Sequence, residues 1–222
     1  MRLRGLACGV AALVAGAFAS PASAVLLGFS GVTQNNQTNT NNGQAQLSVE
    51  VLSAGGALVD FIFRNVGSVA MAITDIYFDD DALLSYNTGA GAAIFNGPGV
   101  LFSQGASPPE LPGANGATPP FQTSPGLGFD ADPPPAGNGV SPGETVTIRL
   151  ALLAGNNFAS VLADLLSRDL RIGIHVQGFA NGGSESFINT NDPPPGTVVP
   201  EPGAALLGLI GLTCLHRIRR GA

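Results

Sequence analysis

The sequence predicts a mainly β protein, an antiparallel β-sandwich with one short helix, and three observations favour this fold class. Apolar and polar residues alternate at period two in several short segments, which is typical of half-buried strands. Turn-forming residues separate these segments, with 31 Gly and 17 Pro in 222 residues. Neither a βαβ alternation nor a repeat of solenoid period is visible. An N-terminal signal helix and a C-terminal transmembrane helix are expected to flank the sandwich.

Seven segments carry a strand pattern. In chain order they are residues 46–51, 58–65, 69–78, 92–102, 143–150, 170–178 and 184–189. The turn at residues 54–57 predicts a hairpin between the first two strands, and the Asn-Gly-Gly turn at 181–183 predicts another between the last two. Successive hairpins of this kind are typical of a sandwich.

Residues 157–166 are predicted to form the one short helix. Phe158, Val161, Leu162, Leu165 and Leu166 recur at helical spacing, which predicts one amphipathic face.

Two stretches are predicted to lack regular structure. Residues 34–44 contain only Asn, Gln, Thr and Gly, a composition typical of a solvated loop or mobile arm. Residues 103–142 contain ten prolines, which are expected to exclude strand interiors and helices. Long loops of this kind are usually functional or disordered.

The first 24 residues have the three parts of a secretory signal peptide. Residues 1–4 are basic, residues 5–18 are apolar, and Ala22 and Ala24 form a small-residue cleavage site. The apolar run is too short to span a membrane comfortably, which favours a cleaved signal over a permanent anchor. Cleavage after Ala24 would leave Val25 as the mature N-terminus.

The last 23 residues combine a turn, an apolar run and a basic cluster. The turn is rigid because two prolines flank an acid: Pro200, Glu201 and Pro202. Residues 203–215 are apolar, and as a helix they would cover about 20 Å of a hydrocarbon core about 30 Å thick. Such a segment suits a transient anchor. The basic cluster favours the cytoplasmic side of a membrane: Arg217, Arg219 and Arg220.

These features resemble the PEP-CTERM proteins, a family of bacterial exported proteins. The tail is similar to the sorting signal that exosortase enzymes recognise. Residues 63–80, 171–179 and 182–187 resemble a recurrent domain of the same proteins. The resemblance implies export, exosortase processing and deposition at the cell surface or in an extracellular or biofilm matrix. It implies no catalytic residues.

The predicted organisation follows from these segments. It comprises a signal peptide at 1–24, a sandwich domain at 25–190 with the Pro-rich loop 103–142, a Pro-rich stalk at 191–199, and the sorting tail at 200–222.

Charge and cysteine content exclude some functions. Residues 25–200 carry four arginines, no lysine and fourteen acidic residues, so a basic face for nucleic acid is disfavoured. The two cysteines, Cys8 and Cys214, lie in the targeting segments, so the domain is expected to have neither a disulfide nor thiol chemistry.

His175 is the only histidine outside the tail. With Ser184 or Ser186 and an aspartate it would make a Ser-His-Asp set, as in a secreted hydrolase. The sequence has no Gly-x-Ser-x-Gly elbow followed by a helix. Since Ile174 and Val176 are expected to point inward, the pattern favours an outward, hydrogen-bonded strand residue at position 175.

Three consecutive carboxylates form the candidate metal site: Asp79, Asp80 and Asp81. Clustered carboxylates at a strand end suit Ca²⁺, and Asp130 and Asp132 from the long loop are possible additional ligands. The spacing is not that of an EF-hand, and a solvated acidic turn is the alternative. No other cofactor is expected.

These observations rank three functions. The first is an exported, non-enzymatic surface or matrix protein with an exosortase-type enzyme as its processing partner and extracellular polysaccharide as a further candidate partner. The alternative is a secreted carbohydrate-binding module, which the scarcity of aromatic platforms disfavours: the chain has no Trp, and its tyrosines are Tyr77 and Tyr86. The hydrolase centred on His175 ranks last.

Overall fold

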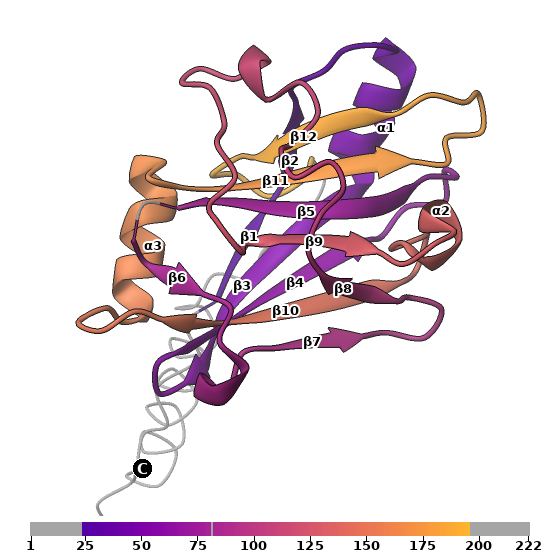
Figure 1. The fold of residues 1–222 in the computed structure, drawn as a ribbon. Helices are drawn as coiled ribbons and strands as arrows, with labels where there is room; N and C mark the ends of the chain where they lie inside the picture. Colours follow the sequence, from indigo (N-terminus) through magenta and orange to yellow (C-terminus); the bar gives the residue numbers. More distant parts are fainter. Residues whose placement is uncertain (1–23, 81, 196–222) are drawn as a thin grey trace, which may run out of the picture.

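The computed structural model describes residues 24–80 and 82–195, which form two antiparallel sheets packed face to face (Figure 1). Sheet A contains β1 (Ala24–Leu27), β3 (Leu47–Gly55), β4 (Leu58–Asn65), β10 (Thr145–Leu152), β6 (Leu84–Ser85) and β7 (Ala93–Asn96). Sheet B contains β2 (Phe29–Gly31), β12 (Glu185–Asn189), β11 (Leu170–Gln177), β5 (Ala72–Asp80), β9 (Gly128–Ala131) and β8 (Phe102–Gln104). The expected mainly β, antiparallel sandwich is confirmed.

The predicted flanking helices fall on residues 1–23 and 196–222, outside the described residues, and they stay predictions. Within the described ranges, no helix has both the length and the apolar character needed to cross a bilayer.

Aromatic side chains from both sheets form the centre of the core. Phe78 of β5 lies between Phe61 and Phe63 of β4, with ring centroids 4.8 Å and 6.3 Å away, and it also meets Phe129 of β9 at 6.1 Å. All four rings are fully buried. Edge-to-face packing of this kind and the area it removes from water hold the two sheets together.

Both predicted hairpins are confirmed: β3 pairs with β4, and β11 pairs with β12. The predicted helix is also confirmed as α3 (Phe158–Ser167), which begins after the capping residue Asn157 and buries Val161 and Leu165. The segment 92–102, predicted to hold one more short strand, contains β7 of sheet A, and β8 of sheet B begins at its last residue.

The loop predicted at residues 34–44 is wrong, because α1 (Gln37–Gln46) occupies most of it. The reason is side-chain hydrogen bonding rather than an apolar face. Asn36 caps the first turn, Asn39 donates to the Gly182 carbonyl at 3.1 Å, and Gln46 donates to Asn65 Oδ1 at 2.8 Å. Polar residues thus make a helix here because each buried amide finds a specific partner.

The helix α1 begins beside a buried carboxylate. Glu185 of β12 is 1% exposed and accepts hydrogen bonds from the backbone N–H groups of Asn35 and Asn36, at 3.2 Å and 2.6 Å. The hydroxyl of Thr33 donates to the same carboxylate at 2.8 Å. An acidic group is favoured there because the N-terminus of a helix carries partial positive charge.

The prediction that prolines exclude regular structure from 103–142 is also wrong in part. The strand β9 lies between Pro125 and Pro133, and the short helix α2 (Pro135–Asn138) follows it. Proline is tolerated at the flanks of a strand and in the first turn of a helix, where no backbone N–H is required. Two 3₁₀ turns complete the elements, η1 (Thr88–Ala90) and η2 (Ala114–Gly116).

Residues 105–125, here called the strap, pass over the outer face of sheet B (Figure 1). Leu111 and Phe121 of the strap form a second apolar cluster with Tyr77 of β5 and Ile188 of β12. Phe121 and Leu111 also approach Gly173 of β11 closely, since a Cβ there would lie 2.9 Å from a Leu111 methyl group. Sheet B is therefore covered on both faces.

Candidate functional site

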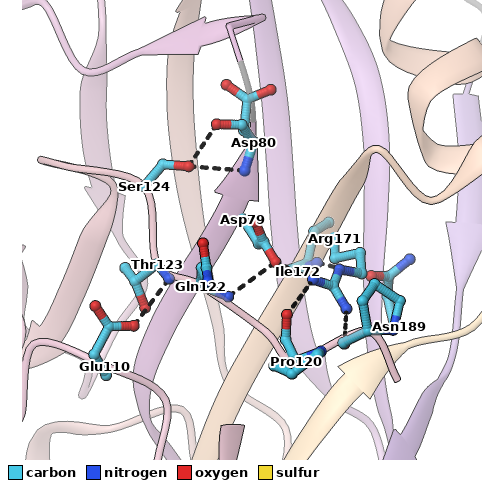
Figure 2. Close-up of polar contacts among 11 residues, drawn as sticks. Asp79, Asp80, Glu110, Pro120, Gln122, Thr123, Ser124, Arg171, Ile172 and Asn189 are labelled. Atoms are coloured by element: carbon cyan, nitrogen blue, oxygen red, sulfur yellow. Dashed lines mark hydrogen bonds and ion pairs between the residues drawn. The ribbon is translucent and has the colours of Figure 1, made fainter. Parts of the chain in front are cut away.

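The strap is held on sheet B by one buried arginine (Figure 2). Arg171 of β11 forms an ion pair with Asp79, its neighbour across the sheet on β5. Its guanidinium also donates to the carbonyl groups of Pro119 and Pro120, at 2.6 Å and 2.8 Å, and lies 5.4 Å from the centre of the Phe121 ring. A single side chain thus satisfies carbonyl groups that have no partner in a regular ladder.

Four consecutive strap residues donate hydrogen bonds through their backbone N–H groups, two of them to β5 and two within the strap. Phe121 donates to the Ala114 carbonyl at 3.1 Å and Ser124 to the Phe78 carbonyl at 2.8 Å. Between them, the N–H of Gln122 donates to Asp79 at 3.0 Å, and that of Thr123 donates to Glu110 at 2.9 Å (Figure 2). The Ser124 hydroxyl donates to the Asp80 carbonyl at 2.6 Å.

The structure does not gather the three candidate calcium ligands around one point. The Asp79 carboxylate forms an ion pair with Arg171. The Asp80 carboxylate accepts hydrogen bonds from the backbone N–H groups of Leu83 and Leu84, at 3.0 Å and 2.9 Å. Asp81 lies outside the described residues. Within those residues, no group of three or more His, Cys, Asp or Glu side chains is placed to hold a metal ion. Calcium binding stays a prediction.

The other carboxylates considered for calcium lie elsewhere on sheet B. Asp130 of β9 lies opposite Asp75 of β5 in the strand register. The Asp132 carboxylate accepts a hydrogen bond from the Ser103 hydroxyl. Burial raises the pKa of the Asp130 carboxyl, and the charges of Asp75 and Asp132 raise that pKa further. Asp80, in contrast, lines a separate pocket of about 250 Å³ with Asp164 and Asp169.

The strand register brings Ser186, His175 and Asp75 into one row across sheet B. His175 Nδ1 lies 3.0 Å from Asp75 Oδ2, so the carboxylate fixes the orientation of the ring. The prediction of a hydrogen-bonded strand residue is confirmed, and Ile174 and Val176 lie in the core as expected. His175 itself is 8% exposed, so its side chain is covered rather than open to solvent. Ser184 lies before β12, outside this row.

The serine of this row is enclosed. Ser186 is 1% exposed, and its Oγ makes no hydrogen bond within residues 24–80 and 82–195. A nucleophilic serine must reach both its base and a substrate carbonyl. An Oγ without contact to solvent or to His175 meets neither condition in this arrangement. Sequence reasoning identified Ser186 and His175, whereas Asp75 became identifiable only from the strand register.

Tyr77 neighbours the same row and ties it to the strap. Its hydroxyl donates to the Pro108 carbonyl at 3.0 Å. Burial raises the pKa of the Tyr77 hydroxyl, and the nearby charges of Asp75 and Asp130 raise it further. The hydroxyl therefore keeps its proton and remains a donor.

A small pocket opens at the edge of the strap, and nothing in the sequence pattern pointed to it. Its volume is about 180 Å³. Its walls come from the β2, β12 and β11 region of sheet B, from the strap at and after η2, and from the end of α3. The lining includes Ser30, Val32, Thr118, Arg168, Arg171 and Asn189.

The predicted processing residues are mostly outside the described part of the chain. Ala24 is the first residue of β1, whereas Ala22 precedes the described residues. All residues of the predicted sorting tail follow residue 195: Pro200, Glu201, Pro202, the apolar run 203–215, and Arg217, Arg219 and Arg220.

Comparison with protein-family models, with curated proteins and with solved structures finds no match to this chain.

The replacement Arg171→Met is expected to lower the free energy of unfolding by about 3 kcal/mol, because it leaves the Asp79 carboxylate without its cation in a largely buried site. The matched control is Arg64→Met. Arg64 pairs with Glu50 on sheet A, where both side chains are about a third exposed, and its loss should cost less than about 1 kcal/mol. Equal losses in urea unfolding of the two variants would contradict the role given to Arg171.

The replacement Ser186→Ala is expected to raise the free energy of unfolding by about 1 kcal/mol, since it removes a buried hydroxyl that lacks a partner. Thermal unfolding of the variant beside the unmodified chain measures this change. A loss of stability would show that the hydroxyl is bonded after all, and would reopen a catalytic role for the row.

Proposed function

We propose that this chain is an exported, non-enzymatic protein of the cell surface or extracellular matrix. Its C-terminal segment 203–215 anchors it transiently, and an exosortase-type protease cuts near the Pro-Glu-Pro turn at 200–202. The proposal follows the signals at the two ends of the sequence. The structural observation that supports it most strongly is how the first and last described segments, residues 24–28 and 190–194, lie on the sandwich.

Residues 190–194 lie against Gly28, where the chain crosses from sheet A to sheet B. The Gly28 N–H donates to the Asp192 carbonyl at 2.7 Å, and the Thr190 N–H donates to the Gly28 carbonyl at 2.9 Å. A Cβ at position 28 would lie 3.0 Å from the backbone nitrogen of Pro194, so this close approach favours glycine. The segment that leads to the tail therefore leaves the sandwich beside β1.

The predicted signal cleavage site falls on β1, the first described strand. Ala24 pairs with Leu52 and Val25 with Val51 in the ladder between β1 and β3. Cleavage after Ala24 would remove one ladder position and leave Val25 in register as the first residue of the domain. Cleavage after Ala24 is thus compatible with an intact sandwich, as a processed surface protein requires.

The domain itself suits an extracellular location. It has no cysteine, so its stability comes from packing and hydrogen bonds and is independent of the redox state of the surroundings. Its excess of acidic residues favours solubility.

A carbohydrate-binding module is the second candidate, and the pocket beside Arg168 is the observation that favours it. The described residues offer no extended aromatic platform for a sugar. Phe95 is the only strongly exposed aromatic side chain among them, at 48%, and Arg149 stacks on it. The hydrolase ranks below both, because the Ser186 hydroxyl is enclosed.

Mass spectrometry of the protein from each fraction of the native host tests the proposed processing. The expected product begins at Val25, ends near Pro200, and is found at the surface or in the medium. A product that keeps Arg217, Arg219 and Arg220 in the membrane fraction would contradict transient anchoring. A domain confined to the cytoplasm would contradict export.

Variants of the tail test whether the predicted motif directs the proteolytic cut. Replacing Pro200, Glu201 and Pro202 together by alanine should leave the tail attached. Replacement of the exposed Pro195 alone, in the stalk, should leave processing unchanged. Equal processing of both variants would show that a different sequence directs the cut.

A further inference from the structure

One arginine, Arg168, forms no ion pair within the described residues. The described residues contain four arginines, and three of them form ion pairs: Arg64 with Glu50, Arg149 with Asp60, and Arg171 with Asp79. Arg168 forms none within these residues, although acids outnumber arginines more than threefold between residues 25 and 200. Its only hydrogen bond there runs from a guanidinium nitrogen to the Asn189 carbonyl at 3.3 Å.

Arg168 also occupies an unfavourable backbone conformation. Its φ is +71°, and it is the only non-glycine residue with positive φ among the described residues. It follows the last turn of α3, where glycine is the usual residue because a Cβ disfavours the left-handed region. A non-glycine residue retained in a strained conformation indicates a role for its side chain.

The side chain of Arg168 lines the 180 Å³ pocket described above, together with other hydrogen-bonding groups. Asn189 is 3% exposed, and its Oδ1 accepts the Ile172 N–H at 2.7 Å. This bond fixes the amide, and its Nδ2 donates no hydrogen bond within the described residues. The Ser30 and Thr118 side chains line the same pocket, and Val32 and Ile188 give it an apolar wall.

We propose that this pocket binds a single carboxylate-bearing sugar unit, a uronic acid residue of an acidic polysaccharide. The planar guanidinium of Arg168 is suited to donate two parallel hydrogen bonds to a carboxylate. The amide and hydroxyl groups suit sugar hydroxyls, and the apolar wall suits the C–H face of a sugar ring. The pocket is smaller than the roughly 300–1,000 Å³ of sites for drug-sized ligands, so it holds one unit of a chain.

The charge of the surroundings favours a carboxylate over a phosphate. The positive charge of Arg171 is already balanced by Asp79, so Arg168 alone supplies net positive charge to the pocket. The single carboxylate of one uronic acid unit balances that charge, whereas a phosphate dianion carries one negative charge more than Arg168 can balance. This inference deepens the proposed function by naming a partner at the cell surface, but binding by the purified chain does not depend on export or processing.

Calorimetric titration of the full-length chain tests the site, with tetragalacturonate as the probe and its fully methyl-esterified form as the uncharged control. The unmodified chain should bind the acid form, and esterification should weaken binding by at least about tenfold, as expected when one charged hydrogen-bond pair is lost. Inorganic phosphate should not compete. Absence of binding, equal binding of the ester, or displacement by phosphate would each overturn the proposal.

The variant Arg168→Gly separates binding from folding. Glycine suits the positive φ, so the melting temperature should rise while affinity for tetragalacturonate falls by at least about tenfold. Arg64→Gln is the matched control, because it removes the same charge from the other sheet, and its affinity should stay within about twofold of the unmodified chain. Unchanged affinity in Arg168→Gly, or an equal loss in both variants, would refute the site.

Discussion

Sheet B has no face that it exposes widely to water, and the rest of the structure depends on this constraint. Eight of the nine residues of β5 are buried. Its inner side packs on sheet A through Phe78, and its outer side carries Tyr77. A sandwich of two sheets normally leaves its outer faces in water. This one requires a third layer, and the strap provides it with Leu111 and Phe121.

The position of the strap explains the polar contacts beside it. A proline-rich segment has few N–H groups and many carbonyl groups without ladder partners, and Arg171 donates to two of these. Asp79 then serves the structure by balancing Arg171, so a carboxylate that resembles a metal ligand in sequence is committed to an ion pair. The edge of the same layer leaves a pocket, and Arg168 reaches it from α3. Architecture and candidate binding site thus have a common origin.

The sequence predicted what depends on periodicity and missed what depends on particular partners. Strands and α3 follow from apolar spacing, so both hairpins were predictable. The helix α1 was missed because Asn39 and Gln46 are stabilised by residues far along the chain. The histidine of the polar row was evident, but its partner Asp75 depends on strand register. No sequence signal marked Arg168, since its proposed role rests on a backbone angle and on the absence of an ion pair within the described residues.

The claim that the strap is a structural layer is tested most directly by hydrogen exchange of four consecutive backbone amides, those of residues 121–124. Each donates a hydrogen bond to the strap itself or to β5. If the strap completes the fold, these amides should exchange far more slowly than unprotected ones and approach the protection of β5. Exchange at the rate of an unstructured chain would show that sheet B folds without its cover, and would contradict the account.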